Sequence, residues 1–116
     1  MPRTSLVTGG AGFIGSHLVD RLVSRGDRVV VVDNFSSGRR ENLNPAAELH
    51  QLDIRSQELH SLVSESMPDF VFHLAAQMSV AVSAREPLLD AEINILGLLN
   101  LLEAVRAGAG TGAGAP

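Results

Sequence analysis

The 116-residue sequence predicts an α/β fold built on a parallel sheet. The first observation is a short apolar strand at 6–8 that runs directly into the glycine cluster at 9–12 and then into a helical pattern. The second is a run of four valines at 29–32, because burial on both faces is typical of a parallel strand. A strand, a helix and a second strand in this order form a right-handed βαβ unit. The length suits one small domain.

The glycine cluster has the spacing of a dinucleotide-binding loop, since glycine recurs at 9, 12 and 15 and also at 10, 12 and 15. One glycine makes the tight turn, a second lets the backbone approach a pyrophosphate, and a third lets the helix pack closely. The N-terminus of the helix offers free N–H groups to the phosphates. Asp33, at the end of the valine strand, would bind ribose hydroxyls and repel a 2′-phosphate, which favours NAD over NADP. Arg39 and Arg40 just downstream weaken this preference, because arginine is the usual partner of a 2′-phosphate.

The remaining elements follow from apolar periodicity. In order they are a helix over 13–24, strands over 28–33 and 48–52, a helix over 56–66, a strand over 69–76 and a helix over 87–106. In the last helix the residues expected to face inward are Leu88, Leu89, Ile93, Leu96, Leu99, Leu102 and Val105. Gly97 in the same helix indicates either close backbone packing or a position without a role. His73 is expected to belong to the core of the fourth strand rather than to a catalytic site.

Composition narrows the classes of function. The net charge of −4 and the pI of about 5.4 leave no basic face for nucleic acid. No apolar run approaches the roughly 18 residues of a membrane span. The absence of cysteine fits a reducing compartment, so we expect a soluble cytoplasmic protein. The histidines show no metal-ligand spacing, so no metal site is expected.

Five stretches of the sequence together resemble the extended short-chain dehydrogenases/reductases, in the NAD-dependent epimerase/dehydratase branch of UDP-glucose 4-epimerase-like proteins. These stretches are Thr8–His17, Asp33–Gly38, Asp53-Ile54, His73–Gln77 and Asn100–Ala104. The resemblance implies a partial Rossmann domain: a doubly wound parallel sheet of order 3-2-1-4, with helices on both faces and truncated before strand 5. Epimerase, dehydratase and decarboxylase remain open as the activity of the parent enzyme.

The resemblance also implies which residues hold NAD. The pyrophosphate would lie on the glycines, the adenosine ribose at the end of the second strand, the adenine after the third and the nicotinamide after the fourth. The cofactor-binding candidates are Gly9, Gly12, Phe13, Ile14, Gly15, Asp33, Asn34, Ser36, Asp53, Ile54, Ala75, Ala76 and Gln77. An alternative role for Asp53 is to cap the helix that follows it.

One departure from the family bears on activity. Its members use a Tyr-x-x-x-Lys pair as acid/base, whereas this chain has no tyrosine and no lysine, so no catalytic residue is assigned. Residues 1–107 are expected to form the NAD-binding half domain and the Gly/Ala-rich residues 108–116 to be disordered. A nucleotide-sugar substrate is expected only for a full-length parent. The alternatives are a non-catalytic NAD-binding sensor or partner module, and a non-functional truncated product.

The fourth strand is nearly all apolar, which is typical of a central strand. Without a fifth strand beside it, residues 70–75 would form an open edge. The edge would be apolar and free of proline, and these features favour strand pairing between molecules. We therefore expect the chain to self-associate through this edge.

Overall fold

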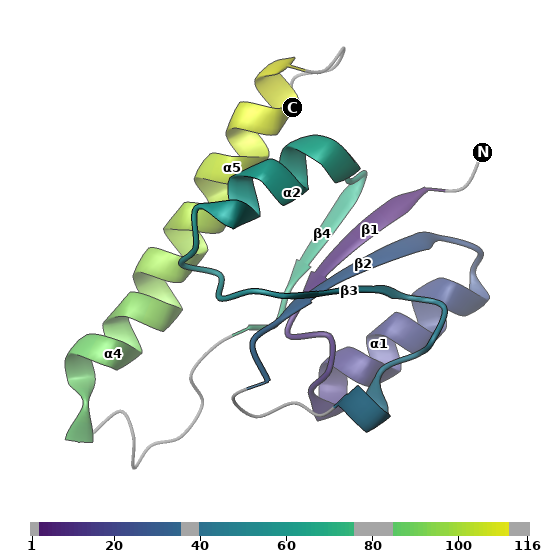
Figure 1. Cartoon of the computed structure of the whole chain (residues 1–116), viewed down its shortest axis with the longest axis horizontal. Helices are drawn as coiled ribbons and strands as arrows, with labels where there is room; N and C mark the ends of the chain where they lie inside the picture. Colours follow the sequence, from purple (N-terminus) through teal and green to yellow (C-terminus); the bar gives the residue numbers. More distant parts are fainter. Residues whose placement is uncertain (1–2, 36–39, 76–84, 112–116) are drawn as a thin grey trace.

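Strands and helices alternate along the chain in the computed structural model, which describes residues 3–35, 40–75 and 85–111 (Figure 1). In chain order the elements are β1 (Thr4–Thr8), α1 (Phe13–Ser24), β2 (Arg28–Asp33), the 3-10 turn η1 (Arg40–Asn42), β3 (Glu48–Gln51), α2 (Glu58–Ser66), β4 (Phe70–His73), α4 (Pro87–Ala91), the π-helical turn η2 (Glu92–Leu96) and α5 (Gly97–Thr111). The bounds predicted for the first helix and the second strand are confirmed. The third and fourth strands end earlier than predicted.

The four strands form one parallel sheet in the order β3-β2-β1-β4, as predicted. Leu6 of β1 lies opposite Val30 of β2 on one side and Val71 of β4 on the other. Among the described strands β4 pairs with β1 alone, so it forms an edge of the sheet. Its apolar composition therefore does not mark a central position in this chain.

Helices cover both faces of the sheet, because alternate residues of each strand point to opposite sides. One face packs against α1 through Val7, Val29, Val31, Val19 and Leu22. The other packs against α2 and α5 through Leu6, Val30, Val32, Leu59, Leu62, Val63, Leu101 and Ala104. Figure 1 shows α1 on one side of the strands, with α2 and α5 together on the other. The valine run is thus buried on both faces, as its composition predicts.

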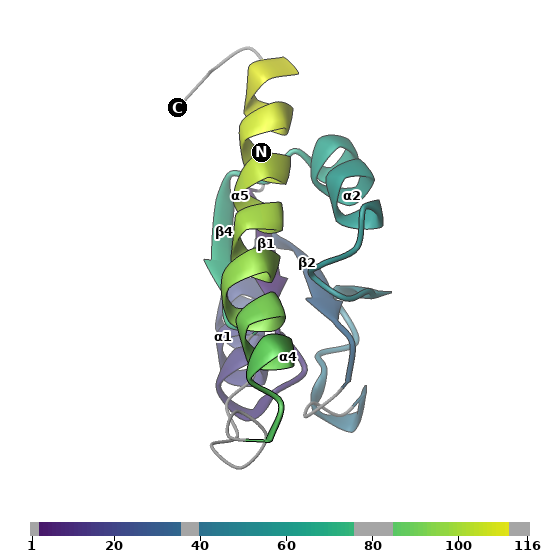
Figure 2. The same cartoon turned by 90° about the vertical axis from the view of Figure 1, so that its left-hand side faces the viewer.

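The inward face predicted for the last helix is wrong in part, although Ile93 and Val105 pack against the core as predicted. Leu88, Leu96, Leu99 and Leu102 are each more than half exposed, while Leu101 and Ala104 are buried. Leu96, Leu99 and Leu102 are three residues apart, and each such step falls about 60° short of a full turn of an α-helix, so the three drift away from the face that carries Leu101 and Ala104. The run begins in the π-helical turn η2. Figure 2 shows α4 and α5 joined through this turn into one long helix.

The C-terminal end of α5 also differs from the prediction. The helix continues to Thr111, so residues 108–111, expected to be disordered, are helical. Propagating an existing helix adds one hydrogen bond per residue, and the intervening alanines favour it. Residues 112–116 lie outside the described part of the chain. Within the described ranges, no helix is both long enough and apolar enough to span a membrane.

Candidate functional site

The carboxyl ends of β1, β2 and β4 meet beside the N-terminus of α1 (Figure 1). From β1 the chain continues to β2 on one side, whereas β4 lies on the other. This point, where the strand order reverses, is where open α/β sheets bind ligands. The structure brings the glycine loop (residues 9–15), Asp33 and Ala75 together here. The predicted site residues outside the described part of the chain are Ser36, Ala76 and Gln77, and so are Arg39 and the side chain of Arg40.

The first two glycines of the loop are required by the fold. Gly9 has a φ of 73°, which favours glycine, and its N–H donates to the Val32 carbonyl at 2.7 Å. A Cβ on Gly9 would lie 2.8 Å from the main-chain nitrogen of Ala75. A Cβ on Gly10 would lie 2.6 Å from Cγ1 of Val31. Side chains are excluded at both positions by the sheet itself.

Gly12 differs from its neighbours. A Cβ on Gly15 would overlap the carbonyl oxygen of Gly9, so that glycine lets α1 approach the loop. A Cβ on Gly12 would meet only the same oxygen, at an ordinary 3.4 Å. The φ of Gly12 is −76°, which any residue adopts. The fold therefore leaves open space at Gly12, and the backbone there is accessible to a ligand.

The N-terminus of α1 is open as well. Gly12 is its N-cap and supplies no side-chain hydrogen bond, and the first turn holds no acidic residue. The first N–H groups of a helix have no partner within it and carry a partial positive charge. Phe13 and Ile14 are 79% and 66% exposed. This end of α1 is therefore suited to binding an anion such as a phosphate.

Asp33 has a structural role that the sequence analysis did not predict. Its side chain is buried at the end of β2, where one carboxylate oxygen accepts from the Ala11 N–H at 3.0 Å. The other oxygen accepts from the Phe35 N–H at 2.6 Å. Each carboxylate oxygen can accept a further hydrogen bond. Asp33 thus fixes the glycine loop to β2 and retains acceptor capacity for a ribose hydroxyl.

Thr8 ties the end of β1 to the end of β4 and was not among the predicted site residues. Its Oγ1 accepts from the N–H groups of Leu74 at 3.0 Å and Ala75 at 3.1 Å. With its lone pairs occupied, the hydroxyl donates to Nδ1 of His73 at 2.8 Å, so the neutral ring carries its proton on Nε2. Burial lowers the pKa of His73. The sequence indicates this role of Thr8 only weakly, because the residue is a single hydroxyl residue between an apolar strand and the first glycine.

Asp53 and Ile54 lie in the β3–α2 loop (residues 52–57). This loop follows β3, the strand next to β2, and β2 ends at Asp33. The carboxylate of Asp53 accepts from Nη2 of Arg55 at 2.6 Å and from its Nε at 2.9 Å. Hydrogen bonding by Arg55, with a smaller effect from Asn34, lowers the pKa of Asp53. The N-cap of α2 is Gln57, so Asp53 does not cap that helix. Ile54 as a whole residue is 4% exposed, and its carbonyl oxygen accepts from the amide of Asn100.

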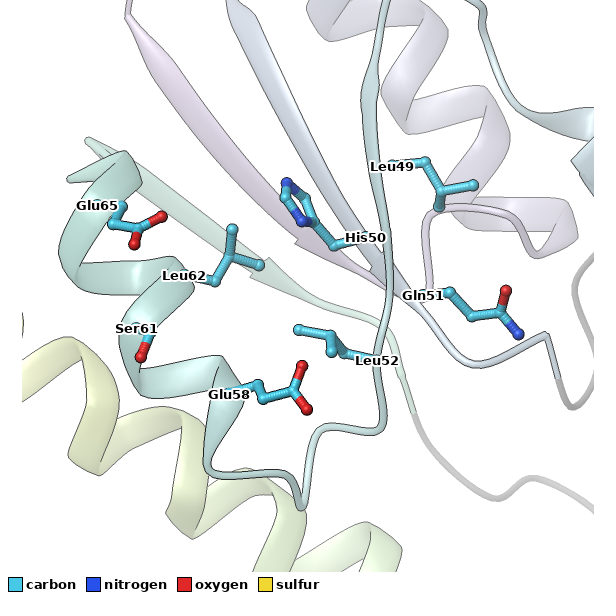
Figure 3. Close-up of a pocket in the computed structure, with 8 residues that line it drawn as sticks. All are labelled: Leu49, His50, Gln51, Leu52, Glu58, Ser61, Leu62 and Glu65. Carbon is cyan, nitrogen blue, oxygen red and sulfur yellow. The ribbon is translucent and has the colours of Figure 1, made fainter.

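A separate groove of about 420 Å³ lies between β3 and α2 (Figure 3). Its lining residues are Leu49, His50, Gln51, Leu52, Glu58, Ser61, Leu62 and Glu65. None of them is a predicted site residue, and the carboxylates of Glu58 and Glu65 would repel a phosphate. In the segments that the structure describes, no group of three or more His, Cys, Asp or Glu could hold a metal ion.

A strand-order reversal, an open glycine loop and an uncapped helix end together define a parallel α/β domain of the nucleotide-binding kind. The sequence profile of the family described as GDP-mannose 4,6 dehydratase matches residues 6–112. The chain belongs to this family of nucleotide-sugar epimerases and dehydratases, and the resemblance of its motifs is confirmed.

Individual relatives agree with this assignment. The chain is 45% identical over 101 residues to a putative UDP-glucose 4-epimerase of Methanocaldococcus jannaschii, covering 87% of this chain and 33% of that protein. It is 49% identical over 107 residues to the UDP-glucose 4-epimerase of Mycolicibacterium smegmatis, covering 88% and 34%.

Solved structures agree as well. The UDP-glucose 4-epimerase of Thermotoga maritima, with UDP-glucose, superimposes with a TM-score of 0.89 at 53% identity, covering 90% of this chain and 34% of that one. The Thermus thermophilus enzyme, in complex with NAD, gives a TM-score of 0.86 at 49% identity, covering 90% and 34%. The chain thus spans about a third of the length of these relatives.

Proposed function

We propose that this chain binds NAD across the carboxyl ends of β2, β1 and β4, as the cofactor-binding portion of a nucleotide-sugar epimerase or dehydratase. The pyrophosphate would lie on the main chain of Gly12, Phe13 and Ile14. The adenosine ribose would bind Asp33 and Asn34, the adenine would contact Asp53 and the main chain of Ile54, and the nicotinamide side would lie by Ala75. Ser36, Ala76 and Gln77 complete the proposed set.

The space at Gly12 carries this proposal. Three glycines of the loop are explained by the fold, because added side chains would meet β2, β4 or the loop itself. The fold makes no such demand at Gly12, where an added Cβ would have ordinary contacts. A missing side chain beside an uncapped helix N-terminus is what the close approach of a pyrophosphate requires.

Asp33 supports a preference for NAD over NADP. Its carboxylate is held by two main-chain N–H groups, so it cannot swing away from a ligand without breaking them. A 2′-phosphate placed there would meet a fixed negative charge, whereas a free ribose hydroxyl would donate to it.

Calorimetric titration of NAD and NADP tests the proposal. We expect NAD to bind the unmodified chain more tightly than NADP. Gly12→Val should abolish NAD binding while the chain remains folded, because the new side chain would occupy the space of the pyrophosphate. Thr4→Val, a similar β-branched change at the far end of β1, is the matched control and should leave the affinity unchanged. Tighter binding of NADP, or unchanged NAD affinity in folded Gly12→Val, would contradict the proposal.

We propose further that this chain alone does not turn over a nucleotide sugar. It contains no tyrosine and no lysine, so these 116 residues cannot supply the acid/base pair implied by the family resemblance. A general acid/base contributes about 10²- to 10⁴-fold in rate. Conversion of UDP-glucose to UDP-galactose by the purified chain, measured with host enzymes removed, would overturn this proposal.

The free edge of β4 supports a proposal of self-association. β4 pairs only with β1 among the described strands, and Phe70 at its start is 39% exposed. The guanidinium groups of Arg3 and Arg25 lie 5.5 and 5.6 Å from the centre of the Phe70 ring. These positive charges discourage another strand from pairing with the beginning of β4. Pairing with a second copy would therefore involve the part of β4 beyond Phe70.

A further inference from the structure

The β3–α2 loop, which carries Asp53 and Ile54, is held by a helix that follows it much later in the chain. Nη1 of Arg55 donates to the carboxylate of Glu92 at 3.0 Å. The amide of Asn100 donates to the carbonyl oxygens of Ile54 at 2.7 Å and of Ser56 at 2.9 Å. The η2–α5 helix therefore holds the loop through two main-chain carbonyls, those of Ile54 and Ser56, and through the side chain of Arg55.

Asn100 is fully used in this arrangement. Both carbonyls can only accept, so the NH₂ of the amide must face them and its Oδ1 must face His60. Nε2 of His60 donates to that oxygen at 2.8 Å. Aspartate and leucine have nearly the same shape as asparagine but lack the two N–H donors. No other side chain of this size could satisfy both carbonyls of the loop.

Gly97 allows the helix to come close enough for these bonds. A Cβ on Gly97 would lie 2.5 Å from Cδ1 and 2.8 Å from Cγ1 of Ile54, whose side chain is buried beneath the loop. Glycine within a helix costs about 1 kcal/mol relative to alanine. This position therefore has a packing role, which resolves the alternatives left open by the sequence.

The π-helical turn η2 brings these contacts onto one side of the helix. The N–H of Gly97 donates to the carbonyl of Glu92, a bond that spans five residues. In a regular α-helix, residues five apart point about 140° away from each other. In a π-helical turn they lie nearly above one another. The turn thus aligns Glu92 with Gly97, and Asn100 follows one α-helical turn later.

We propose that Glu92, Gly97 and Asn100 are positioning residues that hold Asp53 and the main chain of Ile54 ready for the adenine end of the dinucleotide. This inference rests on the proposed NAD site. None of the three needs to touch the cofactor. Their effect is to fix the loop before binding, so that the free energy of binding is not spent on ordering it.

The test uses Asn100→Leu and Asn100→Asp, with Glu103→Gln as the matched control on the exposed side of α5. We expect both Asn100 variants to bind NAD and ADP-ribose about tenfold more weakly, the effect of losing one to two hydrogen bonds. Binding of nicotinamide mononucleotide should be unchanged, because that fragment does not reach the loop. Hydrogen exchange of the loop amides of Arg55 and Ser56 should accelerate about tenfold in the same variants.

Gly97→Ala gives a second test that does not remove a hydrogen bond. Alanine stabilises a helix, so any loss of NAD affinity must come from the contact with Ile54. We expect a loss of about threefold, partly restored when Ile54→Val removes the Cδ1 atom that the new methyl group would meet. Restoration by that second change would distinguish a steric effect on the loop from a general loss of stability.

The outcomes separate the two proposals. If the unmodified chain binds no NAD, the proposed function fails, and the exchange rates alone then decide whether α5 holds the loop. If NAD binds but the Asn100 variants match Glu103→Gln in affinity and in exchange, the positioning role is overturned while the NAD site stands. Equal weakening of NAD and nicotinamide mononucleotide would also contradict the positioning role.

Discussion

The two loops that would hold the dinucleotide differ in what fixes them. The glycine loop is shaped by missing side chains and by main-chain hydrogen bonds to the neighbouring strand, such as that from Gly9 to Val32, and the carboxylate of Asp33 ties it to the same strand. The β3–α2 loop is fixed by side chains, because Asn100 and Glu92 reach it from a helix much later in the chain. The first loop is thus held by the strand ends beside it, whereas the second is held by a helix much later in the chain.

This difference determines how each loop responds to mutation. In the glycine loop, an added side chain at Gly9 or Gly15 would lower stability, since main-chain atoms already fill the space. In the β3–α2 loop, a truncated side chain would weaken the attachment of the loop, since the N–H donors of Asn100 or the carboxylate of Glu92 would be lost.

Gly15→Ala should cause the largest loss of stability. The new methyl group would overlap the carbonyl oxygen of Gly9, and main chain cannot yield easily. We expect about 3 kcal/mol or more of lost unfolding free energy, at the upper end for overpacked sites. Gly12→Ala is the matched control and should cost less than about 1 kcal/mol. Urea denaturation measures both, and equal losses would break the distinction between the two glycines.

Thr8→Val should have an intermediate effect. The change keeps the side-chain volume but removes the acceptor for the Ala75 N–H and the donor to His73. Leaving such groups unsatisfied costs about 1–3 kcal/mol. Thr4→Val, at the other end of β1, serves as the control in the same denaturation experiment. Equal stability of the two variants would mean that the Thr8 hydroxyl is not needed to hold the end of β4 beside the glycine loop.

Stability should depend on His73 below neutral pH. Burial lowers the pKa of this ring in the folded chain from its ordinary value of 6.5. Between the two pKa values the unfolded state binds more protons, so the stabilisation is complete above about pH 6.5 and decreases as the pH falls below it. His73→Asn keeps an acceptor for Thr8 but cannot titrate, and should flatten the decrease.

Thermal unfolding from pH 7.5 to 5 measures the effect of His73. This window lies above the range in which Asp27, Glu48 and Asp53 lose their charge, since the pKa of each is lowered from about 4 by its arginine partner. An identical pH profile for His73→Asn and the unmodified chain would contradict the prediction.

The edges of the sheet should show the smallest effect. At the β3 edge, Glu48 forms an ion pair with Arg28 at 2.6 Å, and such charges discourage pairing between molecules. The β4 edge lacks a comparable charge beyond Phe70. Val71→Lys should therefore weaken self-association several-fold in a sedimentation concentration series, with Val71→Thr as the uncharged control. A monomer at high concentration without any substitution would contradict the proposed self-association.

The local signals in the sequence were sufficient for most of the fold. The glycine spacing and the valine run predicted β1, α1 and β2, because each follows from its own residues. The inward face of the last helix was predicted only in part, because Leu96, Leu99 and Leu102 recur every third residue, a spacing that does not stay on one face of an α-helix. Thr8 and Asn100 were missed as structural residues for a different reason: their partners are 65 and about 45 residues away in the chain, so only the folded structure brings them together.

An NMR titration of the ¹⁵N-labelled chain with NAD tests directly whether the dinucleotide binds at the glycine loop. We expect the largest amide shift changes at Gly12, Phe13 and Ile14, with smaller changes after β2 and in the β3–α2 loop. Little change is expected in the groove between β3 and α2, at residues such as Glu65. Saturable changes centred on that groove, with the amides of the glycine loop unmoved, would contradict the proposed NAD site.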